Sequence, residues 1–132
     1  MEIIKQDDRI MAIIHRAEDW SEGLNFITPD SLFIQVGTWQ YDKGTHLDSH
    51  IHKEYERPVT KTHEMAYVKK GRLKLFIYDE ERKKVGDYIL GAGDFVVLAE
   101  GGHGYEILED DTQVLEAKTG PFVSVDKDKE KF

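Results

Sequence analysis

The sequence contains no cysteine. Disulfide bonds, thiolate metal sites and cysteine nucleophiles are therefore excluded, and any bound metal must have nitrogen and oxygen ligands. Long apolar runs are also missing, because stretches such as 95–99 have only the length of a strand. A membrane span needs roughly 18 apolar residues. Residues 1–8 lack the charged-then-apolar layout of a signal peptide, so we expect a cytoplasmic protein.

An excess of basic residues is absent as well. The chain has 18 Lys and Arg against 26 Asp and Glu, which gives a net charge of −8. Nucleic acids and anionic membranes bind to basic faces, so neither is an expected partner. A local basic patch inside a cavity would still allow a small anionic ligand. The length of 132 residues fits one domain.

Short stretches rich in β-branched and aromatic residues make up most of the chain. Leu73, Leu75 and Ile77 alternate with other side chains, the two-residue period of a strand. Residues 9–20 are compatible with a helix or a strand, and their isoleucines favour a strand. The expected strands lie in 31–40, 64–71, 72–78, 85–90, 94–99, 105–108 and 112–118, with turns between them. Their regular spacing predicts an antiparallel barrel or sandwich.

A His-x-His pair is the first candidate for a metal site. On a strand, His50 and His52 would point to the same face, with Cα atoms roughly 6.5–7 Å apart. Two imidazoles at that separation can bind one ion. Two exposed histidines at this spacing are also common, so the pair needs support from elsewhere in the chain.

Two further residues give that support. Glu64 begins an expected strand and shares a face with Ala66 and Val68, where an unpaired carboxylate is costly. A bound metal ion would offset this cost. If Glu64 instead lies in water at the end of the strand, the cost does not arise. His103 lies among glycines, whose tight backbone can direct a side chain into a barrel or leave it in an exposed turn.

Together these residues resemble the two motifs of the cupin superfamily. In the first, Gly44 precedes His50 and His52 by the usual spacing, and six residues separate Glu64 from Gly71. Residues 93–103 resemble the second motif. They depart from it in two ways: Ala99 stands where proline is usual, and His103 comes one residue earlier than the usual histidine. The resemblance covers about residues 35–118.

The resemblance implies an all-β cupin jelly-roll barrel of antiparallel strands, as a single domain over residues 1–125. It implies one divalent ion held by His50, His52, Glu64 and His103. Three nitrogens and one oxygen suit Fe, Mn, Ni, Co or Zn, and they leave positions open for water or substrate. Residues 126–132 form a charged tail, which predicts a solvated terminus.

One departure from the pattern concerns the carboxylate. Eleven residues separate His52 from Glu64, where cupins usually have three or four. Glu56 has the usual short spacing and is the competing ligand. Glu64 is favoured because it begins a strand, whereas Pro58 makes an interior strand at Glu56 implausible.

The chain is also similar to a narrower group of small cupins with surface-polysaccharide and nucleotide-sugar functions, through segments such as 62–71, 103–106 and 118–122. In that setting Arg57 and Lys118 are candidates for substrate binding. Glu116 and Lys118 share the parity of Val114, so both point into a barrel or both point to solvent. The candidates for a catalytic base are His63, Tyr105 and Glu116.

Three functions follow from this reading. The first is a metal-dependent enzyme on a sugar or sugar-derived molecule, an isomerase, epimerase or oxygenase-like enzyme. The second is a non-catalytic cupin module that binds a metal and a carbohydrate-like ligand. The third is a structural barrel with surface histidines. Cupins commonly pair through an edge strand, which implies a homodimer.

Overall fold

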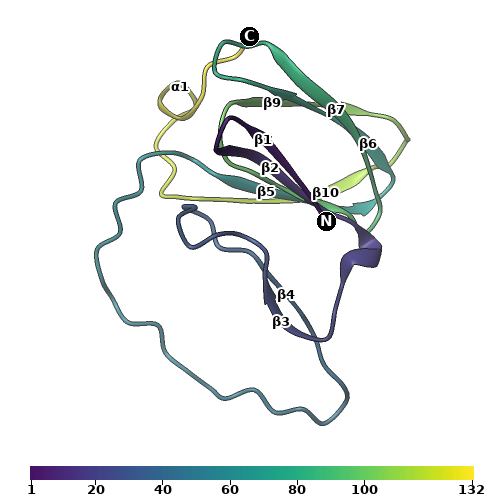
Figure 1. Ribbon diagram of the computed structural model, residues 1–132, viewed down its shortest axis with the longest axis vertical. Helices are drawn as coiled ribbons and strands as arrows, with labels where there is room; N and C mark the ends of the chain where they lie inside the picture. Colours follow the sequence, from purple (N-terminus) through teal and green to yellow (C-terminus); the bar gives the residue numbers. More distant parts are fainter.

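The computed structural model, which describes residues 1–132, is built almost entirely from antiparallel strands (Figure 1). The all-β class expected from the sequence is confirmed. The strands are β1 (Glu2–Gln6), β2 (Arg9–His15), β3 (Gly23–Phe26), β4 (Gly37–Gln40), β5 (Glu64–Lys70), β6 (Arg72–Tyr78), β7 (Lys84–Gly91), β8 (Phe95–Leu98), β9 (Gly102–Ile107) and β10 (Gln113–Lys118). The helices are a short 3-10 turn η1 (Ala17–Asp19) and α1 (Val125–Asp128). Neither these nor any other part of the chain forms a helix able to cross a bilayer.

The strands form two facing sheets and a separate hairpin. One sheet has the order β1-β2-β8-β5-β10, the other has the order β7-β6-β9, and β3 pairs with β4 alone. The sheets remain separate at their edges, so the expected closed barrel is not found. Figure 1 shows the facing sheets in the upper part of the molecule and the hairpin below them.

The main core lies between the two sheets and follows the two-residue period of the strands. Leu73, Leu75 and Ile77 of β6 are at most 2% exposed and face the other sheet. Ala66 and Val68 of β5 meet them from that sheet. Because successive side chains of a strand alternate between faces, Glu64 shares the inner face with these two residues.

A smaller core covers the outer face of the five-stranded sheet. Ile13, Phe95 and Val97 are buried there against residues of the segment 27–36. This explains why the strand expected at 31–40 is reduced to β4. The apolar side chains of Ile34 and Val36 pack onto the sheet as a connecting segment instead of adding a strand to it.

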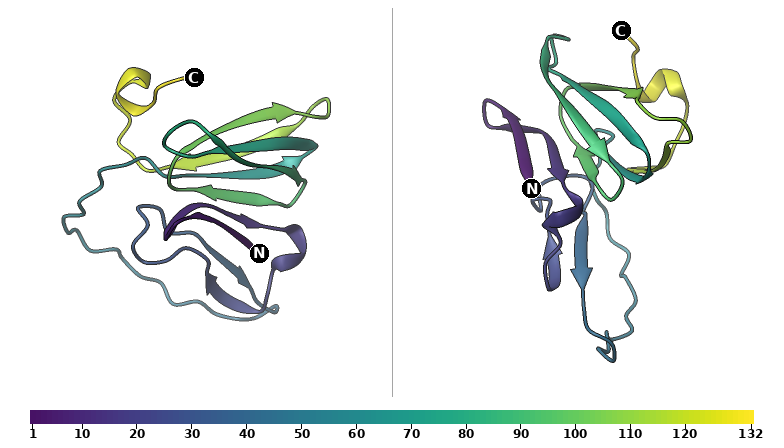
Figure 2. Two further views of the ribbon diagram at one scale, coloured as in Figure 1. Left: turned by 45° about the horizontal axis from the view of Figure 1, so that its top comes forward. Right: turned by 90° about the vertical axis from the view of Figure 1, so that its right-hand side faces the viewer.

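Residues 41–62 differ most from the sequence prediction. They contain no strand, every one of them is exposed, and their only internal backbone hydrogen bond joins Thr45 N–H to the Asp42 carbonyl. Figures 1 and 2 show this segment, called the arm below, extending away from the sheets. A strand forms where its backbone groups find a partner, and here the arm has none.

The turn between β8 and β9 places His103. Gly101 has φ +72°, in the left-handed region, and a side chain there would collide with the Tyr78 carbonyl oxygen and with Met11. Only glycine therefore fits this turn. Gly104 lies three residues later in a conformation open to other residues, with Phe76 3.9 Å from where a Cβ would lie.

Replacing these two glycines tests the turn. We expect Gly101→Ala to lower the free energy of unfolding by about 3 kcal/mol, through backbone strain and overpacking. Gly104→Ala is the matched control and should change stability by less than about 1 kcal/mol. Urea denaturation measures both. Equal stability of the two variants would contradict this account of the turn.

Candidate functional site

Glu64 and His103 meet where the two sheets face each other. Glu64 is the first residue of β5, and His103 is the second residue of β9 in the opposite sheet. His103 Nε2 lies 2.6 Å from Glu64 Oε1, with the two side chains 31% and 9% exposed. A charge-assisted hydrogen bond of this length therefore joins the two sheets at a nearly buried carboxylate.

The strand registers decide which neighbours share this space. In β9, His103 pairs with Ile77 and Tyr105 pairs with Leu75. Directly paired residues point to the same side of a sheet, so His103 and Tyr105 face inward with the core of β6.

The same reasoning settles the direction of the late strand. In β10, Glu116 pairs with Ala66 and Lys118 pairs with Glu64. Both side chains therefore lie on the inner face. The sequence pattern alone allowed either this direction or exposure to solvent. Lys118 Nζ lies 4.0 Å from Glu116 Oε1 and 3.5 Å from Asp128 Oδ2. The ammonium group of Lys118 therefore lies between two carboxylates, those of Glu116 and Asp128.

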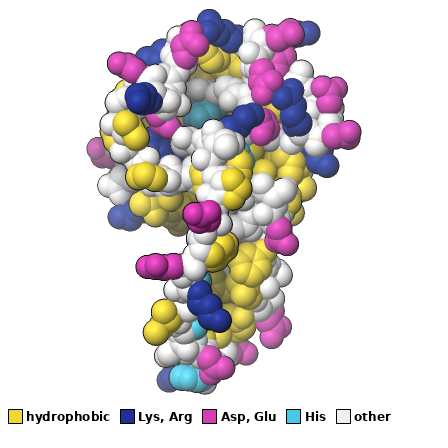
Figure 3. All heavy atoms as spheres, turned by 90° about the vertical axis from the view of Figure 1, so that its left-hand side faces the viewer, with side chains coloured by type: hydrophobic (Ala, Val, Ile, Leu, Met, Phe, Trp, Pro, Cys, Tyr) yellow, Lys and Arg dark blue, Asp and Glu magenta, His cyan; other side chains and the backbone are white.

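Inward side chains of both sheets line a cavity of about 1080 Å³, and Lys118 is not part of that lining. Glu64, His103, Tyr105 and Glu116 are among its 23 lining residues, of which only five are hydrophobic. Figure 3 faces the hollow, whose rim carries acidic and basic side chains. A space of this size and polarity suits a small hydroxylated or charged molecule better than an apolar one.

The pKa values of two groups are shifted by this environment. Burial acts to raise the pKa of Glu64, but the hydrogen bond and charge of His103, with Lys129 and Lys118 nearby, outweigh it and lower the pKa. Burial, reinforced by the charges of Glu64 and Glu116, raises the pKa of Tyr105. At neutral pH the Glu64 carboxylate is ionised and the Tyr105 phenol keeps its proton.

The C-terminal tail lies at the mouth of the cavity. Most of its side chains are exposed, yet several contact the body. Asp128 accepts a hydrogen bond from Thr62, and Glu130 lies 2.7 Å from Arg82. The Phe132 ring packs edge-on against Tyr78 at 5.1 Å. The tail therefore forms part of the wall of the site.

The arm keeps the remaining predicted ligands apart from this pair. The rings of His50 and His52 are 5.0 Å apart, and His50 Nδ1 lies 3.2 Å from the Asp48 carbonyl oxygen. Glu56 is exposed on the same arm, and Arg57 stacks on Tyr55 at 3.6 Å. No group of three or more His, Cys, Asp or Glu is close enough to hold a metal ion.

His63 lies where the arm rejoins the body, outside the cavity. Its side chain is buried, and Nδ1 accepts a hydrogen bond from the Phe33 N–H at 3.1 Å. Burial lowers the pKa of His63, which keeps it neutral. The His63 carbonyl accepts a hydrogen bond from the Thr119 N–H, and the His63 N–H donates to Thr119 Oγ1, which holds His63 to the residue that follows β10. His63 therefore attaches the end of the arm to the segment at Phe33 and to Thr119.

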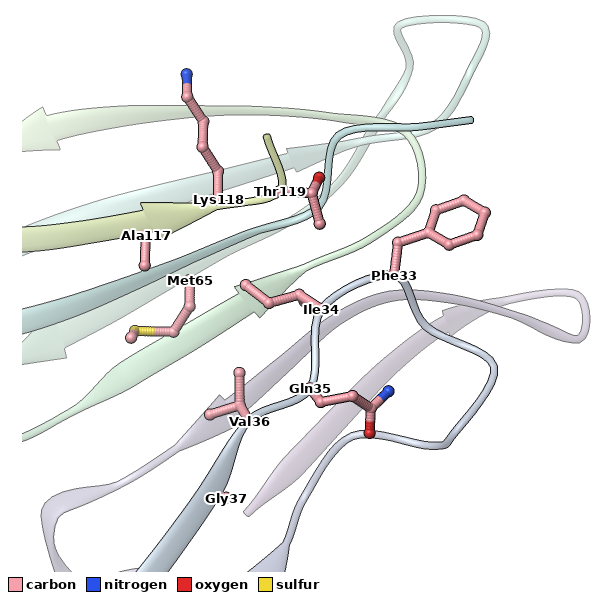
Figure 4. A pocket seen from close by; sticks show the side chains of 9 residues that line it. All are labelled: Phe33, Ile34, Gln35, Val36, Gly37, Met65, Ala117, Lys118 and Thr119. Carbon is pink, nitrogen blue, oxygen red and sulfur yellow. The ribbon is translucent and has the colours of Figure 1, made fainter. Parts of the chain in front are cut away.

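A second, shallower cavity of about 440 Å³ lies on the outer side of β5 and β10. Met65, the segment 33–37 and the end of β10 with Thr119 (residues 117–119) line it. Figure 4 shows the Lys118 side chain pointing away from Met65 and Ala117, toward the other side of the strand. This agrees with the inward direction given by its register.

Sequence reasoning missed several residues of the site. Thr62, Glu100 and the tail residues 127–132 all line the cavity. Glu100 forms an ion pair with Lys61 beside the mouth. The nearness of Glu100 to His103 in the sequence was a usable signal for its position. The alternating charges of the tail carried no such signal, because they equally describe a solvated terminus.

No protein-family model, curated protein or solved structure matches this chain. The arrangement of the side chains is therefore the basis for any functional assignment.

The lowered pKa of Glu64 gives a testable pH dependence. Its carboxylate stabilises the fold fully above the ordinary value of 4.5, and this stabilisation is lost as pH falls through the lower folded-state pKa. We expect Glu64→Gln to lower the unfolding free energy by about 1 kcal/mol at pH 7. The difference from the native protein should shrink below pH 4.5. Denaturant titrations across pH 3–7 measure it.

Glu106→Gln is the matched control, because Glu106 lies on the outer face of β9 and is exposed. Its stability should follow that of the native protein at every pH. Identical pH profiles for the two variants would show that the Glu64–His103 contact does not stabilise the fold.

Proposed function

We propose that the chain is a metal-dependent enzyme of the cupin type that acts on a sugar or sugar-derived molecule in the cavity beside Glu64 and His103. The observation that carries the proposal is the meeting of these two side chains in a polar cavity. One comes from each of the two cupin-like segments, which are far apart in the sequence. The two facing antiparallel sheets are compatible with a jelly roll whose edge is open.

Glu64 and His103 provide too few ligands to hold a divalent metal ion. Glu64 and His103 are two donors in contact, whereas a stable centre for a divalent transition metal uses three or four protein ligands. As placed, His50 and His52 lie on the arm, so the present residues do not fit a complete metal centre. The proposal therefore requires the arm of a chain to reach the cavity. A bound divalent ion would supply Lewis-acid activation of a carbonyl or hydroxyl group.

The remaining inward side chains have separable roles. The raised pKa of Tyr105 keeps its phenol protonated, so it donates a hydrogen bond to a substrate oxygen and is a poor base. Glu116 is the ionisable group placed to accept a proton from the substrate. Lys118 offers a positive charge to a carboxylate or phosphate of the ligand. Hydroxyl groups suit the polar lining.

Metal binding tests the first part of the proposal. We expect purified protein to bind about one divalent ion per chain, and His50→Ala with His52→Ala to lower the affinity at least about 100-fold. His46→Ala is the matched control on the same arm and should retain the ion. Elemental analysis and calorimetry measure the binding. Native protein free of any specific ion would refute the metal-dependent enzyme.

Turnover tests the second part. Against a panel of sugars, nucleotide sugars and keto acids, we expect catalysis of at least one compound, with Glu116→Gln lowering kcat about 100-fold or more through loss of the base. Glu106→Gln should leave kcat unchanged. Tight binding of a panel compound without turnover would instead support the non-catalytic binding module.

A further inference from the structure

The charged tail, residues 126–132, crosses the mouth of the cavity from one sheet to the other. Residues 127–132 all line the cavity. Asp128 contacts Lys118 at the end of β10, in the five-stranded sheet, and Phe132 contacts Tyr78 at the end of β6, in the three-stranded sheet. Figure 1 shows the last residues passing α1 and ending beside the turn between β6 and β7. The tail therefore spans the opening between the sheets.

The tail is attached to the body by side chains alone. Its backbone hydrogen bonds stay within it, from the Asp128 N–H to the Ser124 carbonyl and from the Lys129 N–H to the Val125 carbonyl. No backbone hydrogen bond joins residues 120–132 to a sheet, and no residue of α1 is buried. Segments with few buried contacts open locally at low cost. The tail can therefore leave the mouth without breaking a strand pairing.

Two ion pairs join the tail to cations on opposite sides of the mouth. Asp128 Oδ2 lies 3.5 Å from Lys118 Nζ, and Glu130 Oε1 lies 2.7 Å from Arg82 Nη2 in the turn between β6 and β7. Ion pairs near the surface are weak and are exchanged readily for other counter-charges. The tail thus places its own carboxylates on two cations that could otherwise bind an anionic ligand.

An aromatic contact fixes the end of the tail. The Phe132 ring packs edge-on against Tyr78 at 5.1 Å, and the Arg82 guanidinium lies 5.4 Å from the ring centre. Gly102 leaves room for this ring, because a Cβ there would lie 2.9 Å from the Phe132 Cζ. Its φ is outside the left-handed region, so the backbone does not require glycine at this position. The missing side chain at Gly102 therefore makes space for the tail.

We propose that the tail is an autoinhibitory strap, which closes the cavity until an anionic ligand replaces the carboxylates of Asp128 and Glu130 on Lys118 and Arg82. The phosphate or carboxylate groups of such a ligand take the positions that the tail carboxylates hold in this structure. Docking of the tail and binding of the ligand then exclude one another, and the affinity falls with the fraction of closed chains. The strap rests on the proposed function only in that the cavity takes a ligand, and it needs neither a metal ion nor turnover.

A thiol inside the cavity tests the strap, because the native chain has no cysteine. Tyr105→Cys places one thiol on the inward face of β9, among the lining residues. A docked tail should slow the reaction of this thiol with a bulky dye maleimide. The small reagent methyl methanethiosulfonate should react at a similar rate in every variant, which corrects for differences in thiol reactivity.

Gly102→Ala, added to the full-length reporter chain, should displace Phe132 and open the mouth. A minor open state holds at most about one tenth of the molecules, so we expect the dye to react about 10-fold faster after this change. Gly104→Ala is the matched control, because the nearest atom to a Cβ there is 3.9 Å away, and its rate should stay at that of the reporter chain.

Removing the tail charges gives a second, independent opening. Asp128→Asn with Glu130→Gln should raise the dye rate by a similar factor. Asp126→Asn, a change of a tail carboxylate outside these two ion pairs, should not. Dye rates in Gly102→Ala and in the charge variant that equal those of their controls would overturn the strap.

Inorganic phosphate tests the ligand that releases the tail. At equal ionic strength we expect phosphate to raise the dye rate of the reporter chain at least about threefold above its rate in chloride, by shifting molecules to the open state. In the charge variant the two salts should give the same rate, because its tail is already released. Equal rates in phosphate and chloride for the reporter chain would overturn the anionic ligand as the competitor of the tail.

Discussion

The contact between Glu64 and His103 joins the two sheets at the side where the fold is open. Apolar side chains of β1, β2, β5, β6, β7 and β8 also hold the sheets together, through a non-directional attraction that sets no particular chemistry. Gln6 and Arg9 add polar contacts to Asp79 and Glu80 after β6. At the open side a nearly buried carboxylate needs a partner, and His103 provides it at 2.6 Å. The cavity, the inward direction of its neighbours and the shifted pKa values are arranged around this pair.

The alternation of side chains made much of this site predictable. Leu73, Leu75 and Ile77 gave the period of β6, and the glycines before His103 gave the turn that places it. The sequence also indicated that Glu64 shares the face of Ala66 and Val68, which the structure confirms. Once the register is known, the direction of Glu116 follows as well.

Other features depend on contacts that a sequence does not encode locally. The rule that places His50 and His52 on one face applies only if their segment has a strand partner, and within one chain it has none. Ile34 and Val36 have β-forming side chains, but they pack on the outer face of a sheet without pairing to it. The tail reads as a solvated terminus, although Phe132 contacts Tyr78. In each case the presence or absence of a long-range contact decided between local alternatives.

The edge strand β9 has a partner on one side only, and the arm is exposed and has no strand partner. The most direct measurement is anomalous diffraction from crystals grown with Co²⁺, which locates the ion and the residue that supplies each ligand. We expect one strong peak beside Glu64 and His103, with the imidazoles of His50 and His52 bound to the same ion. An ion bound elsewhere, or a His103 ring turned into solvent away from Glu64, would contradict it.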